Sequence, residues 1–235
     1  MHLSGSIGPL SAKSRGPIAS GRKASKHQIY GKMNRTISRA NEVFDRSVAD
    51  YHITDNVDAE MRNPYPEGSL EAILYAKNWV DAVQWHLEDI IRDPAIDPVE
   101  ALALKRRIDR SNQVRTDMVE DIDTWFRTLY ENVTPLPDAT INTESPAWAI
   151  DRLSILALKI WHMREQTSRT DADPAHLEKC AGRLAVLLEQ REDLTAAISR
   201  LLDDIGCGRK FMKVYRQMKM YNDPATNPVL YGKKG

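Results

Sequence analysis

A long uninterrupted run of helix-forming residues covers 98–131, PVEALALKRRIDRSNQVRTDMVEDIDTWFRTLYE, which has no glycine and no proline after its first residue. At about 100° per residue, positions three or four apart share one face of an α-helix. That face is mostly apolar and comprises Ala101, Leu104, Ile108, Asn112, Arg115, Val119, Ile122, Phe126 and Leu129. The stretch therefore predicts a long helix with one buried face.

The same periodicity predicts further helices on both sides of this stretch, over about 34–57, 70–92, 145–167, 174–205 and 209–221. Ser69 and Asp97 stand where N-caps are expected, and proline or glycine marks the connections. No strand-like alternation of useful length is present. We therefore predict an all-α, antiparallel bundle of five to six helices. It forms one domain over residues 34–231, whose end at 222–231 is extended, followed by a flexible tail at 232–235.

Residues 1–33 differ from the rest in composition. The first 32 residues contain six Lys or Arg, no acidic residue, and many Ser and Gly. Such a segment cannot bury a core, so we expect a disordered basic arm. A start codon placed too early explains the same composition, since Met33 opens the part of the chain that has helical periodicity.

The composition limits the class of protein. The formal net charge is zero, but the 33 Lys and Arg include the six in the arm, which leaves 27 basic against 33 acidic residues in the body. A mildly acidic body argues against nucleic-acid binding. Two cysteines provide neither a disulfide framework nor a zinc motif, and no apolar run reaches the length of a membrane helix. We expect a cytoplasmic protein; the sequence does not indicate its oligomeric state.

Arginines interrupt two apolar helix faces, Arg115 in residues 98–131 and Arg191 in 174–205. A buried guanidinium keeps its proton and needs a negative partner. One interpretation is a structural network in which Asp109 and Asp151 neutralise the arginines. The other is an anion pocket between helices. Residues 145–167 are apolar on two sides, which predicts a central helix with buried charges. The predicted anion-binding set is Asn112, Arg115, Arg152, Lys159 and Arg191.

Two histidines are candidates for moving a proton, His86 in QWHLEDIIR (84–92) and His162 in the helix predicted to be central. Glu88 and Asp89 in the first motif are a weaker alternative, as ligands of Mg²⁺ in a metal-dependent hydrolase. These two side chains point about 100° apart on a helix, so no metal or other cofactor is otherwise expected.

Four segments together resemble a known family: QWHLEDIIR (84–92), KRRIDRSNQVR (105–115), DRLSILALKIWHM (151–163) and KMYNDP (219–224). In this combination they are similar to a bacterial, all-helical family catalogued only as a domain of unknown function, over about residues 40–231. The resemblance implies an all-helical fold and genes near glycosyltransferases of envelope polysaccharide synthesis. It carries no catalytic residues.

From these observations we expect a protein that binds a small anionic metabolite, phosphorylated or carboxylated, inside the bundle. Envelope sugar metabolism is the context that the resemblance implies. The alternative is a non-enzymatic partner of a glycosyltransferase, with the basic helix at 209–221 and, if it is exposed, Trp79 as its contact surface. The metal-dependent hydrolase is a third hypothesis.

Overall fold

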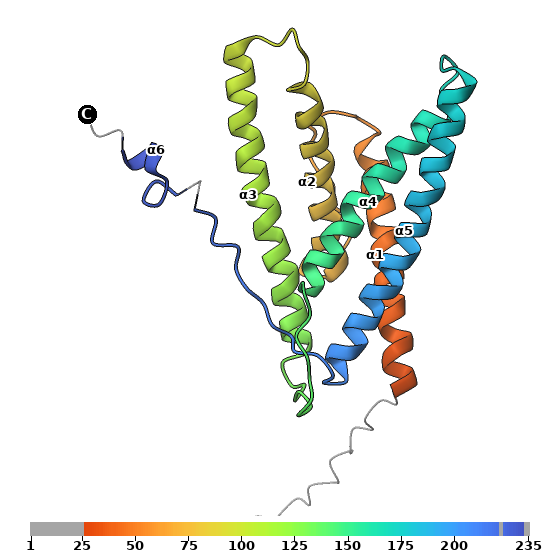
Figure 1. Ribbon diagram of the computed structural model, residues 1–235, viewed down its shortest axis with the longest axis vertical. Coiled ribbons are helices and arrows are strands. Elements are labelled where there is room, and N and C mark those ends of the chain that lie inside the picture. Colours follow the sequence, from red (N-terminus) through yellow and green to blue (C-terminus); the bar gives the residue numbers. More distant parts are fainter. Residues whose placement is uncertain (1–25, 221–222, 233–235) are drawn as a thin grey trace, which may run out of the picture.

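The computed structural model describes residues 26–220 and 223–232, with side chains from Thr36 onward (Figure 1). Residues 1–25 of the predicted arm and 233–235 of the predicted tail lie outside this range. The described part of the chain is helical without strands, which confirms the all-α prediction. Its helices are α1 (Lys26–Tyr51), α2 (Leu70–Ile90), α3 (Pro98–Leu129), α4 (Pro146–Thr167), α5 (Pro174–Gly206) and α6 (Pro228–Tyr231).

Four of the long helices begin at a side chain that accepts hydrogen bonds from the first backbone amides. The caps are Ser69 for α2, Asp97 for α3, Ser145 for α4 and Asp173 for α5. Proline follows the cap at the start of α3, α4 and α5, where its missing N–H costs no hydrogen bond. The predicted starts of these helices are confirmed, because cap chemistry is local in sequence.

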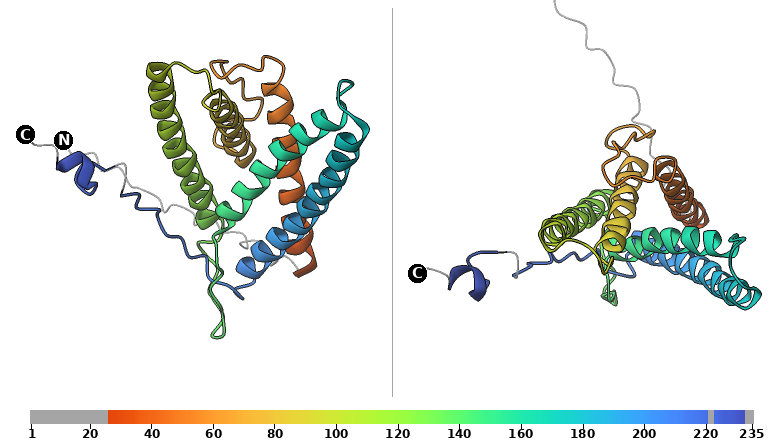
Figure 2. Two further views of the ribbon diagram at one scale, coloured as in Figure 1. Left: turned by 45° about the horizontal axis from the view of Figure 1, so that its top comes forward. Right: turned by 90° about the horizontal axis from the view of Figure 1, so that it is seen from above.

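The helix α4 is central, as its two apolar faces predicted. It packs against α5 most extensively and also touches α1, α2 and α3. Figure 2 shows α4 crossing the bundle obliquely, with α3 next to its N-terminal end and α5 next to its C-terminal half. Apolar side chains from α1 to α5 join in one core, in which Phe44, Leu153 and Leu202 are fully buried. None of the described helices is both long and apolar enough to cross a membrane.

Two predicted helix boundaries are wrong at the N-terminal end of the bundle. The helix α1 begins at Lys26, so residues 26–33 of the predicted arm are helical. It ends at Tyr51, six residues before the predicted end at Val57. The termination is a turn in which the amide of Asp55, at φ +48°, donates to the carbonyl of Tyr51. Aspartate tolerates this left-handed conformation better than most residues, so the sequence contains a signal for this stop.

The predicted helix at 209–221 is also wrong, because its backbone hydrogen-bonds elsewhere. After Gly208 at φ +74°, the carbonyl of Arg209 accepts from the amide of Thr140, and the amide of Phe211 donates to the carbonyl of Thr140. The segment then runs extended along α3, where Lys219 Nζ donates to the carbonyl of Asn112 at 3.1 Å. The part predicted to be extended contains the short helix α6.

Candidate functional site

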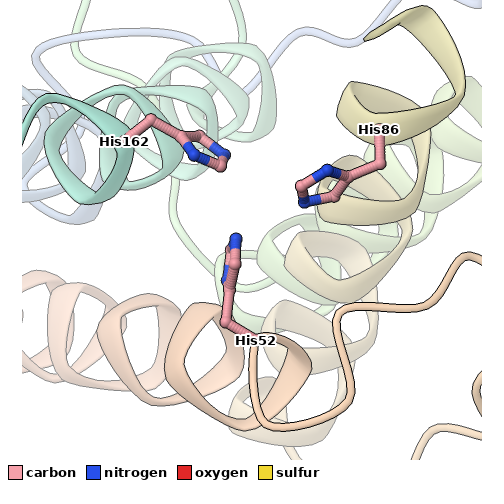
Figure 3. A group of neighbouring side chains, drawn as sticks. All are labelled: His52, His86 and His162. Atoms are coloured by element: carbon pink, nitrogen blue, oxygen red, sulfur yellow. The ribbon is translucent and has the colours of Figure 1, made fainter. Parts of the chain in front are cut away.

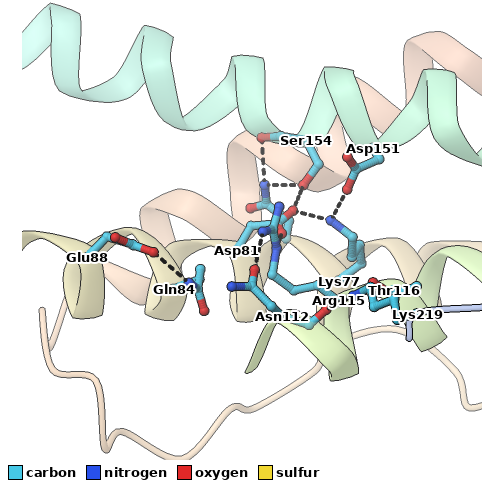
Figure 4. Close-up of polar contacts among 11 residues, drawn as sticks. Lys77, Asp81, Gln84, Glu88, Asn112, Arg115, Thr116, Asp151, Ser154 and Lys219 are labelled. Atoms are coloured by element: carbon cyan, nitrogen blue, oxygen red, sulfur yellow. Dashed lines mark hydrogen bonds and ion pairs between the residues drawn. The ribbon is translucent and has the colours of Figure 1, made fainter. Parts of the chain in front are cut away.

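A network of charged side chains lies between α2, α3 and α4 (Figure 4). Lys77 on α2 has no exposed surface, and its Nζ lies 2.5 Å from Asp81 Oδ2 and 2.6 Å from Asp151 Oδ1. The other oxygen of Asp81 accepts from Arg115 Nε at 2.5 Å, and Ser154 Oγ donates to Oδ2 at 2.5 Å. Two cations and two carboxylates thus compensate one another, as buried charges must.

The network contains the negative partner that the sequence analysis required for Arg115. Its side chain is 22% exposed, and its guanidinium is neutralised by Asp81, not by Asp109 or Asp151. Asp151 pairs with Lys77 instead, and Asp109 pairs with Lys105 on the outer surface of α3. A structural network is therefore present, but its acidic members were predicted only in part.

Sequence reasoning missed Lys77 and Asp81. The apolar stripe that the sequence indicates for α2 is Ile73, Val80, Val83, Leu87 and Ile90, but of these only Leu87 is buried, and Ile90 is exposed. The face that contains Leu70, Leu74, Lys77 and Asp81 is buried instead. The available signal was the i,i+4 spacing of a lysine and an aspartate in register with two leucines.

A cavity of about 470 Å³ adjoins this network between α2, α3 and α4. It is lined by Asp81, Gln84, Trp85, Glu88, Asp89, Arg92, Asn112, Arg115 and Ile155. Most of these residues belong to the segments 84–92 and 105–115, which were singled out in the sequence. The cavity therefore brings together two motifs that are separated in sequence by the α2–α3 connection.

The polar atoms of the cavity are only partly used by the protein. Arg115 Nη1 donates to Asn112 Oδ1 at 3.1 Å, while Nη2 has no hydrogen bond to any described residue. Gln84 Nε2 donates to Glu88 Oε1 at 3.3 Å, and the buried Oε1 of Gln84 has no partner in the described chain. Glu88 also pairs with Arg92. The cavity thus has at least one free hydrogen-bond donor and one free acceptor for a ligand.

The remaining predicted anion-binding residues do not line this cavity. Arg152 is exposed and pairs with Glu144. Lys159 is exposed as well, and both side chains line a separate groove of about 620 Å³ between α4 and α5. Arg191 Nη1 lies 3.0 Å from Asp45 on α1. The expected burial of Arg152 and Lys159 is wrong, because these two positions, seven apart, share an edge of α4 that its neighbours leave uncovered.

Three histidines converge on the other side of Trp85: His52 after the end of α1, His86 on α2 and His162 on α4 (Figure 3). One ring nitrogen from each lies within 4.8 Å of the other two. Trp85 lines the cavity and also stacks on His162, with ring centroids 4.8 Å apart. The sequence indicated two of these imidazoles, but His52, next to a helix end and in no motif, carried no signal of its own.

Glu88 and Asp89, which were predicted as possible metal ligands, do not belong to the histidine group. Within the described residues, the three histidines are the one group of three or more His, Cys, Asp or Glu with ligand atoms this close. Glu88 is engaged by Gln84 and Arg92, and Asp89 is exposed. The pairing of Glu88 with Asp89 as a metal site is therefore not supported by the geometry.

A family model described as Protein of unknown function (DUF4254) matches residues 71–214, more than half of the chain. The match contains every residue that lines the cavity, together with His86 and His162, and His52 precedes it. No curated protein and no solved structure matches the chain.

Proposed function

Since this chain belongs to the family described as Protein of unknown function (DUF4254), we propose a function from the chemistry of its cavity. The protein binds a small polar metabolite that carries hydroxyl groups and one anionic group, a phosphate or carboxylate, between α2, α3 and α4. The observation that carries this proposal is the unused Nη2 of Arg115 at a cavity of about 470 Å³.

The guanidinium of Arg115 is held in place before any ligand arrives. Asp81 accepts from its Nε at 2.5 Å and Asn112 from its Nη1 at 3.1 Å, so the plane of the group is set by two elements. Nη2 then offers N–H donors in a fixed direction at no further cost in side-chain entropy. A preorganised arginine of this kind suits phosphate and carboxylate oxygens.

The charge of the cavity favours a ligand that has hydroxyl groups as well as an anionic group. Its lining contains three carboxylates, of which Asp81 is paired with Lys77 and Arg115, and Glu88 with Arg92. Asp89 adds a negative charge, and its carboxylate accepts hydrogen bonds from hydroxyl groups. The buried Oε1 of Gln84 is another acceptor. A sugar phosphate or a hydroxy acid has this combination of groups, and sugars agree with the envelope context that the resemblance implies.

Isothermal titration calorimetry with hexose phosphates, nucleotide sugars, hydroxy acids and inorganic phosphate tests the proposal. A charge-assisted hydrogen bond contributes about 1.5–3 kcal/mol, so Arg115→Lys should weaken binding about 10- to 100-fold while retaining a cation for Asp81. Arg152→Met is the matched control, because this arginine lies outside the cavity and pairs with Glu144. No binding of any of these classes, or an equal loss in the control, would contradict the proposal.

The alternative of a glycosyltransferase partner loses both of its predicted contact features. Trp79 is only 7% exposed and packs in the core. Residues 209–220 do not form a basic helix. Proton transfer by His86 or His162 stays a prediction, since their imidazoles lie across Trp85 from the cavity.

A further inference from the structure

We propose that His52, His86 and His162 form a binding site for one divalent transition-metal ion, with Zn²⁺ as the best fit. The inference goes beyond the cavity and does not depend on its ligand. The three side chains come from the turn after α1, from α2 and from α4, so the site exists only when these elements are packed together (Figure 3).

The separation of the ring nitrogens suits a metal of this size. Zinc binds histidine nitrogen at about 2.0–2.1 Å in tetrahedral geometry, which places two ligand nitrogens about 3.4 Å apart. The ligand atoms here lie within 4.8 Å of one another. Each imidazole therefore needs to move inward by less than about 1 Å, a shift that a small change in the side-chain torsions provides.

Hydrogen bonds at Nδ1 determine which nitrogen faces the centre. His52 Nδ1 lies 2.7 Å from the carbonyl oxygen of Val48, and His162 Nδ1 lies 2.8 Å from Glu165 Oε2. Both oxygens only accept, so both Nδ1 atoms carry hydrogen and the Nε2 atoms of neutral rings present lone pairs. Metal-binding histidines are commonly oriented in this way, by a carboxylate or a backbone carbonyl on the second nitrogen.

The three Nε2 atoms cannot satisfy one another. All three are buried, and none has a hydrogen-bond partner in the described part of the chain. His52 and His162 both present acceptors, so a single N–H on His86 can satisfy at most one of them. At least one buried lone pair therefore lacks a partner in the described part of the chain and is open to a metal ion, a proton or a water molecule.

A metal ion satisfies these lone pairs better than a proton does. A proton on one Nε2 would leave the other two lone pairs competing for one hydrogen, whereas a metal ion binds all three.

Nearby carboxylates balance the charge of such an ion, and its fourth coordination position is open. Asp55 Oδ1 lies 3.4 Å from His86 Nε2 without forming a hydrogen bond, and its side chain is 61% exposed. Together with Glu165 behind His162, two carboxylates balance a charge of +2. Asp55 is not among the side chains whose ligand atoms lie within 4.8 Å of one another, so the fourth position is left to a water molecule. Three histidines with one open position are one of the ligand sets of catalytic zinc sites.

Aromatic rings hold the imidazoles in this arrangement. Trp161 stacks on His52 with centroids 4.8 Å apart, Trp85 stacks on His162 at 4.8 Å, and Tyr51 stacks on His86 at 5.1 Å. A ligand set whose rotamers are already restricted pays little entropy on binding. The competing explanation is that the histidines only pack as part of this aromatic cluster, and the experiment separates the two.

The experiment uses chelator-treated full chain, titrated with Co²⁺ and with Zn²⁺ alone. We expect one Co²⁺ per chain with the visible absorption of a four- or five-coordinate ion, and its displacement by one Zn²⁺. His52→Phe keeps the ring stacking but removes the nitrogen, and should weaken Zn²⁺ binding at least 100-fold. His176→Gln is the matched control, because His176 Nε2 lies 3.4 Å from Cys180 Sγ and this pair could collect a stray ion.

Glu165→Gln keeps the proposal testable if His52→Phe fails to fold. Its side chain is 50% exposed, so the fold should tolerate the change, and loss of a carboxylate behind a ligand typically weakens metal binding about 10- to 100-fold. Absence of Zn²⁺ binding below millimolar concentration would overturn the proposal. So would Zn²⁺ binding that survives His52→Phe in a folded protein, or that disappears with His176→Gln.

Discussion

Replacing Lys77 with methionine measures how strongly the interior network depends on its central cation. The Nζ atom lies 2.5 Å from Asp81 and 2.6 Å from Asp151, and the Lys77 side chain is 1% exposed. Methionine fills similar volume, so the main effect is the loss of charge. Breaking a buried ion pair by removing one partner costs about 3–5 kcal/mol. We expect about 3 kcal/mol, because Asp81 keeps Arg115 and the side chain of Asp151 is 19% exposed and can regain water.

Lys105→Met is the matched control, since Lys105 also pairs with an aspartate four residues later. Those two side chains are 55% and 43% exposed, and exposed pairs contribute about 0–1 kcal/mol. Urea denaturation followed by far-UV circular dichroism gives both free energies of unfolding, provided that the slopes agree. Adding Asp151→Asn to Lys77→Met should recover part of the loss by removing an unpaired carboxylate. If Lys77→Met costs no more than Lys105→Met, the network is not a buried ion-pair system.

Three further outcomes follow from the same structure. Gly208→Ala should cost about 2–5 kcal/mol in urea denaturation, because φ is +74° and the new Cβ would lie 2.7 Å from the carbonyl oxygen of Thr134. Gly68→Ala, at φ +77° with open space around it, should cost only about 1–2 kcal/mol, and equal losses would contradict the steric argument. Because the pKa of His86 is lowered in the fold, the unfolded chain binds more protons below about pH 6.5. With a chelator present, the melting temperature should therefore be lower at pH 5.5 than at pH 8, and His86→Gln should reduce this difference. If the variant shows the same difference between the two pH values, His86 is not its cause. Ser145→Ala should lower stability by about 1–3 kcal/mol in thermal unfolding, since its hydroxyl caps α4 and donates to a buried carboxylate on α3; a neutral effect would count against both roles.

The helices were predictable where their signals are local. The starts of α3, α4 and α5 follow from an aspartate or serine before a proline, and the long apolar face of α3 follows from its periodicity. The prediction of a helix at 209–221 was wrong because the backbone of this segment hydrogen-bonds to a residue that is distant in sequence. The backbone at 209–211 pairs with Thr140, and no pattern within the segment reports that partner.

In the candidate site, too, contacts within one helix were predictable and contacts between distant segments were not. Arg115 and Asn112 do line a cavity and touch each other, as two polar residues three apart on one helix face can. Arg191 also has a negative partner, but it is Asp45, 146 residues away. The third imidazole of the histidine group, His52, comes from the end of a helix that was predicted to continue for several more residues.

Local sequence patterns were enough to predict the five long helices apart from the two ends of α1, the central place of α4, and the charged groups that interrupt apolar faces. These properties depend on residues within one or two turns of each other, whose spacing is set by the geometry of the helix. Which charged groups meet depends instead on how the helices pack. Asp81 and Arg115 are 34 residues apart, and whether they touch depends on how far each helix is rotated about its axis. A rotation by one residue, about 100°, would exchange the buried face of α2 for another, and the packing of all five long helices together selects among these faces.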